Sequence, residues 1–280
     1  MASPDGCDSP MPLDNPPAVS RLHRQQNWKK TSLETELLTA LLIVLAAFAT
    51  AVFHSAGGFG GGLLLAICLA PILGVKETVP VTATAMIVSN MTRVWVFRHA
   101  VRWRVFVAVF GSAVPFIALS AVIYISLPVP VVALILGIFL ILSVPLRRAM
   151  DKRDFKVGSK GLALAAVPYG LISGSTFGAG MMLAPFLMGA GLAGEYLVGT
   201  VASIGFGLNL TKSLIFGFSP LLDGALFLKG VVIGLCTIPG AFVGRWIVRN
   251  TPLRIHSLFM EGFILCGAVY FLWVAAGQFG

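Results

Sequence analysis

Charged residues are scarce in this chain. Only 11% of its 280 residues are Asp, Glu, Lys or Arg, whereas 57% are hydrophobic. An average soluble domain has about 25% charged residues, so too few charges are present to cover a water-exposed surface. This composition excludes an ordinary soluble enzyme, a disordered chain and a fibrous protein. It predicts an all-α integral membrane protein, surrounded mostly by lipid.

Acidic residues are the rarer of the two charges. The chain has 11 Asp and Glu against 20 Lys and Arg, and its net charge is +9. The basic residues stand at the ends of apolar runs, where cytoplasmic loops of membrane proteins carry them. No basic stripe alternates with aromatic residues, as single-strand binding would require. We therefore expect no nucleic-acid partner.

Cysteine is also rare. The chain has four, and none belongs to a C-x-x-C pair or has a histidine at ligand spacing: Cys7, Cys68, Cys236 and Cys266. We interpret them as small hydrophobic residues. We expect neither a metal site nor a cofactor.

The apolar residues form ten segments after a polar, proline-rich tail at residues 1–32, which we predict to be disordered. The segments are approximately 35–56, 61–73, 78–97, 105–126, 129–146, 161–176, 180–192, 196–218, 225–247 and 258–277. A membrane crossing takes about 20 residues, but the second and seventh segments are much shorter. Each follows a glycine-rich break, Gly57–Gly62 or Gly174–Gly180. A short helix after broken backbone is expected where the chain lines a cavity inside the protein.

The two breaks belong to an internal duplication. Four matches occur in the same order in both halves: Phe59 with Phe177, Glu77 with Glu195, Asn90-Met91-Thr92-Arg93 with Asn209-Leu210-Thr211-Lys212, and Gly111–Pro115 with Gly234–Pro239. We therefore predict two transmembrane repeats, 33–146 and 161–280, joined by a basic cytoplasmic loop at 147–160. Each repeat holds five segments, and an odd number makes the two repeats inverted in the membrane.

The loop charges fit this inversion. Arg98, Arg102 and Arg104 follow the third segment, whereas the equivalent loop after the eighth carries only Asp223 and Lys229. With ten crossings the basic loops all face the cytoplasm. Four basic residues before the first segment do not fit, and eight crossings would place that tail inside instead. We keep the arrangement with ten crossings.

The glycine breaks also suggest a binding site. A helix N-terminus leaves four backbone N–H groups without partners and carries about half a positive charge. Two such ends that point at the bilayer midplane would bind an anion. Tight helix packing by small residues is the alternative. Repetition of the break favours a substrate site, which we place at Ser55, Gly58, Phe59, Gly60, Gly61, Gly62, Asn90, Ser173, Thr176, Phe177, Gly178, Ala179, Gly180 and Asn209.

Five ionisable residues are further candidates. Arg93 and Lys212 are repeat-equivalent cations that either shape the approach of an anion or extend to the membrane interface. His54 lies in an apolar run beside the first break, which makes it a candidate for proton coupling. Glu77 and Glu195 are candidates too, although stabilisation of a helix start is the more ordinary role of a carboxylate there.

Several motifs together resemble a known family. They are Gly58-Phe59-Gly60-Gly61-Gly62 leading to Pro71, the stretch from Thr82 to Asn90, the basic turn Arg98–Trp103, and in the second half Phe177–Gly180, Pro185 and Gly199-Thr200. Through these motifs residues 35–277 resemble the TauE/SafE sulfite exporter family, also called the 4-toluene sulfonate uptake permeases. Ala179 departs from the first copy, which has Gly61 at that place.

The resemblance implies secondary transport of small anions across the bacterial inner membrane. The substrates of the family are mostly sulfur oxyanions and organosulfonates, with some carboxylates. We expect an alternating-access carrier with a small anion as substrate, lipid around it and a proton as a candidate co-substrate, and we favour export. Two alternatives stay open: an intramembrane serine hydrolase that uses Ser173 and His54, and an anion channel or scaffold without alternating access.

Overall fold

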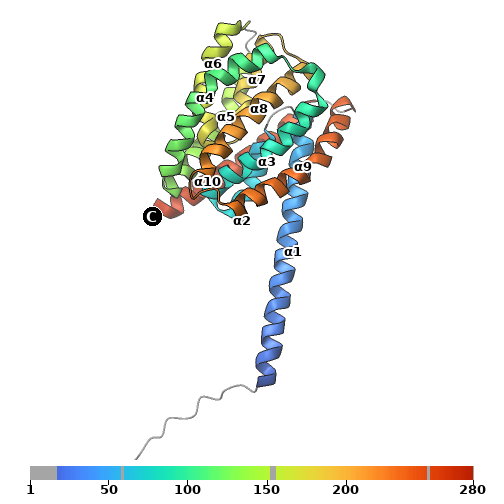
Figure 1. Ribbon diagram of the computed structural model, residues 1–280, viewed down its shortest axis with the longest axis vertical. Helices are drawn as coiled ribbons and strands as arrows, with labels where there is room; N and C mark the ends of the chain where they lie inside the picture. Colours follow the sequence, from blue (N-terminus) through green and yellow to red (C-terminus); the bar gives the residue numbers. More distant parts are fainter. Residues whose placement is uncertain (1–17, 58–59, 152–155, 251–252, 280) are drawn as a thin grey trace, which may run out of the picture. The chain divides into compact units, whose positions relative to one another are not determined.

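A computed structural model describes residues 18–57, 60–151, 156–250 and 253–279. The chain divides into two compact units, Met1–Leu42 and Ile43–Gly280. In the described part of the first unit the chain is helical, and most of its side chains from Glu34 onward are exposed. The second unit is a bundle of helices and contains every residue of the candidate site discussed below (Figure 1).

The described residues form ten α-helices and one 3₁₀ helix, and no strand occurs among them. The elements are α1 (Ala18–Gly57), α2 (Gly61–Leu73), α3 (Val75–Val96), η1 (Arg98–Ala100), α4 (Trp103–Ser126), α5 (Val129–Asp151), α6 (Ser159–Ser175), α7 (Gly180–Gly189), α8 (Gly194–Gly217), α9 (Gly224–Asn250) and α10 (Leu253–Phe279). Each predicted apolar segment corresponds to one helix, so the prediction of an all-α membrane protein is confirmed.

The first helix begins earlier than the sequence predicted. Helix α1 starts at Ala18, so residues 18–32 are helical where we expected a disordered tail. The last tail prolines are Pro16 and Pro17, and the residues after them include many Arg, Gln, Lys, Leu and Glu, which are good helix formers. Residues 1–17 of the predicted tail lie outside the described residues.

Among the residues that the structure describes, five helices are long and apolar enough to cross a membrane. The candidate spans are Glu34–Ser55, Trp103–Ser126, Val129–Leu146, Gly194–Gly217 and Gly224–Gly244. Large apolar side chains cover much of the outer surface; Trp95, Leu164 and Trp273 are 69, 75 and 72% exposed. Water would disfavour such a surface, whereas lipid accepts it. The protein is therefore a multi-pass membrane protein.

Helices α2 and α7 are half-length, with 13 and 10 residues. A glycine with positive φ precedes each one: Gly60, at 91°, stands directly before α2, and Gly178, at 77°, stands two residues before α7. Residues with a Cβ rarely adopt this backbone conformation, so glycine allows the chain to turn sharply before each short helix. The glycine-rich breaks of the sequence are thus the starting points of two short helices.

Glycines also bring pairs of long helices into close contact. A Cβ at Gly170 or Gly174 of α6 would lie 2.6 Å from a backbone carbonyl oxygen of α4. A Cβ at Gly240 or Gly244 of α9 would lie 2.5 Å from a carbonyl oxygen of α1. Small residues let helix backbones approach closely in membrane proteins. These four glycines therefore fix two equivalent helix pairs.

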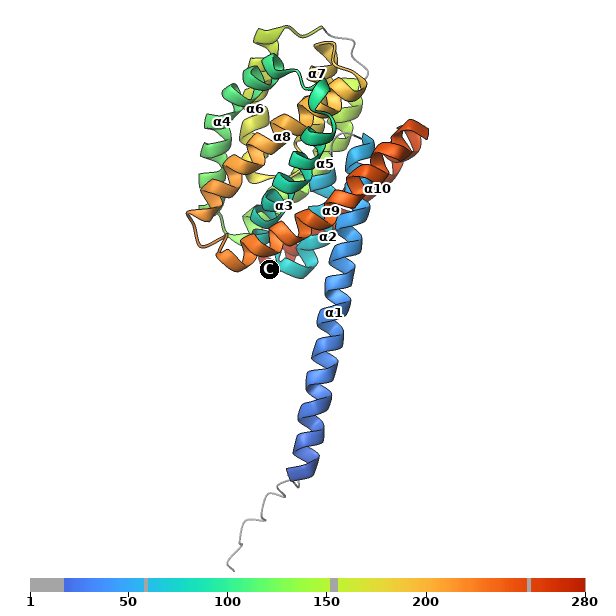
Figure 2. The same ribbon diagram turned by 45° about the vertical axis from the view of Figure 1, so that its right-hand side comes forward.

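The helices of the second unit pack in matching pairs. Helix α3 lies against α8 and α9, and α8 also lies against α4 (Figures 1 and 2). Helix α5 lies against α10. The short helix α2 contacts α3 and α10, and the short helix α7 contacts α8 and α5. Exchanging α2, α3, α4 and α5 with α7, α8, α9 and α10 reproduces the same set of contacts.

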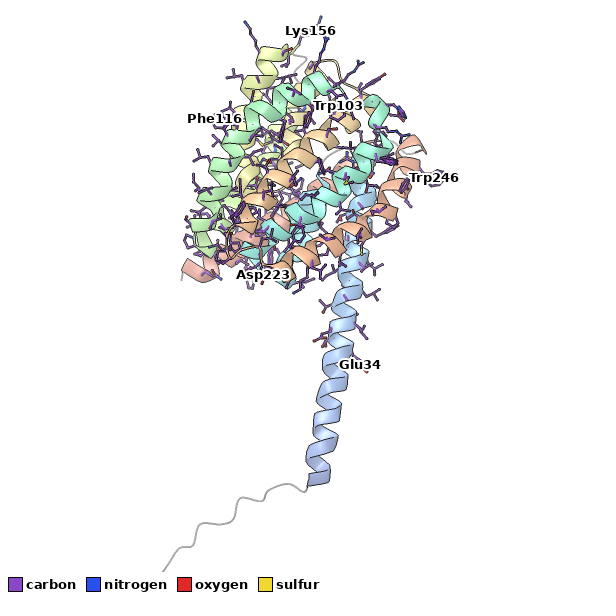
Figure 3. All side chains as sticks on the ribbon, in the orientation of Figure 1. Glu34, Trp103, Phe116, Lys156, Asp223 and Trp246 are labelled. Atoms are coloured by element: carbon purple, nitrogen blue, oxygen red, sulfur yellow. The ribbon has the colours of Figure 1, made fainter. Side chains whose placement is uncertain are left out.

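The loops gather at two ends of this bundle. Figure 3 shows Trp103 and Lys156 toward one end and Asp223 at the opposite end. Trp103 is the first residue of α4 and lies within the basic stretch Arg98–Arg104. Lys156 lies in the basic connection between α5 and α6. Two of the basic loops thus lie at one end, while the acidic Asp223 lies at the other.

Candidate anion site

A cavity of about 70 Å³ lies inside the second unit. One bound water needs about 10–15 Å³, so the cavity has room for a group the size of a few water molecules. It is lined by His54, Gly60, Gly62, Val79, Thr82, Ala83, Met86, Asn90, Tyr169, Ser173, Phe177, Gly178, Ala179, Gly180, Val201, Gly205, Leu208, Asn209 and Lys212. The starts of α2 and α7 therefore line the same cavity.

The start of α7 lies at the cavity. Residues 178–180 line it, and their N–H groups make no hydrogen bond to another described residue. The cap residue Ala179 contributes no side-chain hydrogen bond either. The first N–H groups of a helix together with its dipole attract negative charge. The start of α7 is thus suited to hold an anion.

The start of α2 is arranged differently. Here the N–H group of Gly61 donates a hydrogen bond of 3.0 Å to Nδ1 of His54. Ile172 stands at the place of His54 in the second half, and its apolar side chain offers no such acceptor. One helix start is therefore partly covered by a side chain of the protein, and the other is not.

Arg93 is buried beside His54. Its side chain is 1% exposed, and Nη1 lies 2.5 Å from Nε2 of His54 and 3.4 Å from Oδ1 of Asn90. The same Asn90 oxygen lies 3.5 Å from Nε2 of His54. Arg93 thus belongs to a polar cluster next to the cavity, although it does not line the cavity itself.

Lys212 is the buried cation of the second half. It is 5% exposed, lines the cavity, and its Nζ donates a hydrogen bond of 3.3 Å to the carbonyl oxygen of Thr176. Asn209 lines the cavity one turn earlier, and its Nδ2 donates to the carbonyl oxygen of Gly205 at 2.7 Å. Both cations are thus buried inside the bundle and are not exposed on its surface.

Thr82 carries a hydroxyl group that the described residues do not satisfy. Its side chain is 2% exposed, it lines the cavity, and Oγ1 has no hydrogen-bond partner among the described residues. Buried polar groups in native proteins almost always have partners, so an exception calls for a water or a ligand. The buried hydroxyl of Ser55 also has no hydrogen-bond partner among the described residues, but Ser55 does not line the cavity.

None of the described residues that line the cavity is acidic. The positive charge of Lys212 therefore faces the cavity without a carboxylate from its lining. A buried charge without a partner is costly, and an anion in the cavity would compensate for it. The electrostatic character of the cavity favours a negatively charged occupant.

Some predicted site residues lie elsewhere. Glu77 and Glu195 stand in the first turns of α3 and α8, away from the cavity, which agrees with a role in stabilising helix starts. Gly61 and Thr176 adjoin the cavity without lining it. Gly58 and Phe59 lie outside the described residues.

Other lining residues were not singled out from the sequence. Tyr169 and Met86 bring a phenol and a thioether to the cavity, and Gly205 provides space beside Asn90. Tyr169 lies one turn before Ser173 on α6, but a tyrosine in an apolar run carries no signal of its own. Only the packing of the helices reveals that these side chains converge.

A serine hydrolase requires a different arrangement. Ser173 and His54 both line the cavity, but no hydrogen bond joins them among the described residues. Both ring nitrogens of His54 instead face donors, Gly61 and Arg93. A general base needs a free acceptor aimed at the nucleophile. The geometry therefore does not favour this alternative.

Comparison with known proteins supplies the family. The family described as "Sulfite exporter TauE/SafE" matches residues 43–271, which is most of the chain. No curated protein matches the chain. No solved structure matches it either. With the membrane helices and the cavity described above, the chain belongs to the TauE/SafE sulfite exporter family, a family of membrane transporters.

Proposed function

We propose that this protein is a secondary transporter that carries small oxyanions such as sulfite, organosulfonates or small carboxylates by alternating access. The observation that supports it most strongly is the convergence of two helix starts, Lys212 and the unpartnered Thr82 hydroxyl on one cavity. Backbone N–H groups, a hydroxyl and an ammonium all donate hydrogen bonds, and an oxyanion has only acceptors. The cavity and its proposed occupant are thus complementary.

In this proposal the anion lies between Gly60–Gly62 and Gly178–Gly180. The side chains of Asn90, Ser173 and Asn209 stand around it. Half-helix N-termini that point at an anionic substrate near the bilayer midplane recur in transporters with inverted repeats. Arg93 acts beside the anion through His54 and Asn90.

The proposed movement rests on two inverted repeats. Its support is the matching packing of the helices: α4 pairs with α6 through glycines as α9 pairs with α1, and α2 meets α10 as α7 meets α5. Such a molecule can open to either side by rocking one repeat against the other while the central site stays in place. The basic loops at one end would face the cytoplasm of a bacterial inner membrane.

Export is the direction we propose. A monoanion that leaves an inside-negative cell gains about 2.3 kcal/mol for each 100 mV of membrane potential, whereas uptake of the same ion works against it. Production of the anion inside the cell adds a concentration gradient in the same direction.

Transport by purified protein in proteoliposomes tests the proposal. We expect saturable sulfite flux and counterflow, because a carrier exchanges substrate and a channel does not. Gly60→Val and Gly178→Val should each abolish the flux, since both glycines have positive φ and line the cavity. Gly111→Val is the matched control, because a side chain there meets no atom within 4 Å. Full flux in both cavity variants would contradict the site.

A further inference from the structure

The hydrogen-bond donors of the cavity come mostly from the second half of the chain. Ser173 of α6, residues 178–180 at the start of α7, and Asn209 and Lys212 of α8 all line it. Lys212 adds a positive charge, and the helix start adds the positive end of its dipole. A negatively charged group in the cavity is therefore drawn toward this side.

The opposite side of the cavity is mostly apolar. Helix α3 contributes Val79, Ala83 and Met86 to the lining, and Thr82 adds a hydroxyl group. The start of α2 contributes glycines, which bring no side chain. Binding sites for small molecules commonly combine an apolar wall with a few polar groups that fix the orientation. An occupant with a charged end and a small apolar end matches the two sides of this cavity.

Met86 provides the apolar contact nearest to the donors of α3. Thr82 and Met86 are four residues apart, so they stand on the same face of the helix, about 5–6 Å from each other. An oxyanion that accepts a hydrogen bond from Thr82 therefore has the Met86 thioether beside it. One turn further along, Asn90 is polar again, and its Oδ1 lies 3.4 Å from Nη1 of Arg93. The apolar space beside the oxyanion is thus short.

The side chain of Met86 is closely packed. It is 5% exposed, and a Cβ at Gly62 would lie 3.2 Å from its Sδ atom. Met86 also belongs to a cluster of buried apolar side chains that includes Leu65, Ala85 and Ile233. The thioether therefore touches both the cavity and this cluster. Shortening the side chain would extend the cavity toward apolar atoms.

We propose that Met86 limits the apolar substituent of the transported oxyanion to the size of a methyl group. The inference rests on the proposed transport function and narrows its substrates to sulfite and to oxyanions with a methyl-sized substituent. The size of the cavity, about 70 Å³, supports this limit. A sulfonate with one carbon atom has about five non-hydrogen atoms, and one water needs about 10–15 Å³ of such a cavity. Sulfonates are monoanions, so the membrane potential favours their export as well.

A longer substituent collides with the packed thioether. Extra methylene groups in a well-packed interior force side chains out of their preferred conformations. One methylene group too many in an apolar pocket weakens binding about 10- to 200-fold. Met86 is thus the specificity-determining residue, while Lys212, Thr82 and the start of α7 hold the charged end.

Calorimetry on the full chain in detergent tests this assignment with methanesulfonate and 1-propanesulfonate. Both probes carry the same charged group and differ only in the length of the alkyl chain. The wild type should bind propanesulfonate at least about tenfold more weakly than methanesulfonate. Met86→Ala should reverse this order, because each methylene group that enters the new apolar space improves the Kd about fourfold.

Met91→Ala is the matched control. Met91 lies on the same helix, but it is 61% exposed and does not line the cavity. This variant should keep the wild-type order of the two sulfonates. Should Met86→Ala fail to fold, Met86→Val takes its place, since it removes less of the side chain. Met86→Val should bind ethanesulfonate more tightly than the wild type does.

Counterflow in proteoliposomes extends the test from binding to transport. The wild type should exchange methanesulfonate and not propanesulfonate, and Met86→Ala should exchange both. Equal wild-type affinity for the two sulfonates, wild-type binding of sulfite alone, or an unchanged order in the folded Met86 variant would overturn the inference and leave anion transport in place. A wild type that binds neither sulfite nor methanesulfonate would overturn the proposed function itself.

Discussion

The exchange Gly178→Ala tests the start of α7 most sharply. Gly178 has φ of 77°, and a Cβ there would lie 2.5 Å from Cβ of Leu63, which is fully buried. The left-handed backbone costs a residue with a Cβ about 1–2 kcal/mol. Overpacking against a buried side chain costs about 1–3 kcal/mol more. We therefore expect the free energy of unfolding to fall by about 2–5 kcal/mol.

Gly191→Ala is the matched control. Gly191 also has positive φ, 84°, but a Cβ there meets no atom within 4 Å, and the residue does not line the cavity. The free energy of unfolding of this variant should fall only by the cost of the left-handed backbone, about 1–2 kcal/mol. Its affinity for sulfite should equal that of the wild type, because the site is intact.

The two variants should differ in anion binding as well. Relaxation around the new Cβ of Gly178→Ala moves the N–H groups of α7 away from the anion. Loss of one hydrogen bond to a charged group costs about 1.5–3 kcal/mol, which weakens the Kd roughly 10- to 100-fold. Thermal unfolding in detergent with and without sulfite measures both quantities. Equal sulfite affinity in the two variants would refute the assignment of α7 to the site.

Three further predictions concern the cavity and the helix contacts. Lys212→Met should leave the melting temperature unchanged or raise it, because it removes a buried charge. The same variant should show no sulfite binding in calorimetry. Thr82→Val should not destabilise the protein, because it deletes a hydroxyl without a partner among the described residues. Sulfite affinity should fall about 10- to 100-fold, because that hydroxyl donates to a charged oxyanion. Gly174→Leu should prevent folding, since its Cβ would lie 2.6 Å from a backbone oxygen of α4, whereas Gly111→Leu on an open surface should be tolerated in a thermal melt.

The sequence predicted the helices well because hydrophobic run length and glycine breaks are local signals. All ten segments and both short helices were found, and the residues at Gly60–Gly62 and Gly178–Gly180 do meet at one cavity. The duplication made this possible, because one glycine-rich stretch alone is as typical of helix packing as of a site.

The parts that the sequence missed depend on how distant helices pack. Arg93 stands late in its segment and could have extended to the interface, but α1 places His54 against it. Tyr169 and Met86 line the cavity because α6 and α3 turn those faces inward. Ser55 lies beside His54 in the chain and yet does not line the cavity. None of these orientations follows from residue type or spacing.

An experimental structure with selenate bound would test the central claim most directly, since selenium identifies the position of the oxyanion by its anomalous scattering. The account predicts a single selenium peak in the cavity, within hydrogen-bond reach of Gly178–Gly180, Thr82 and Lys212. A peak outside this cavity, at either membrane surface, or no peak in it at saturating selenate would contradict the account.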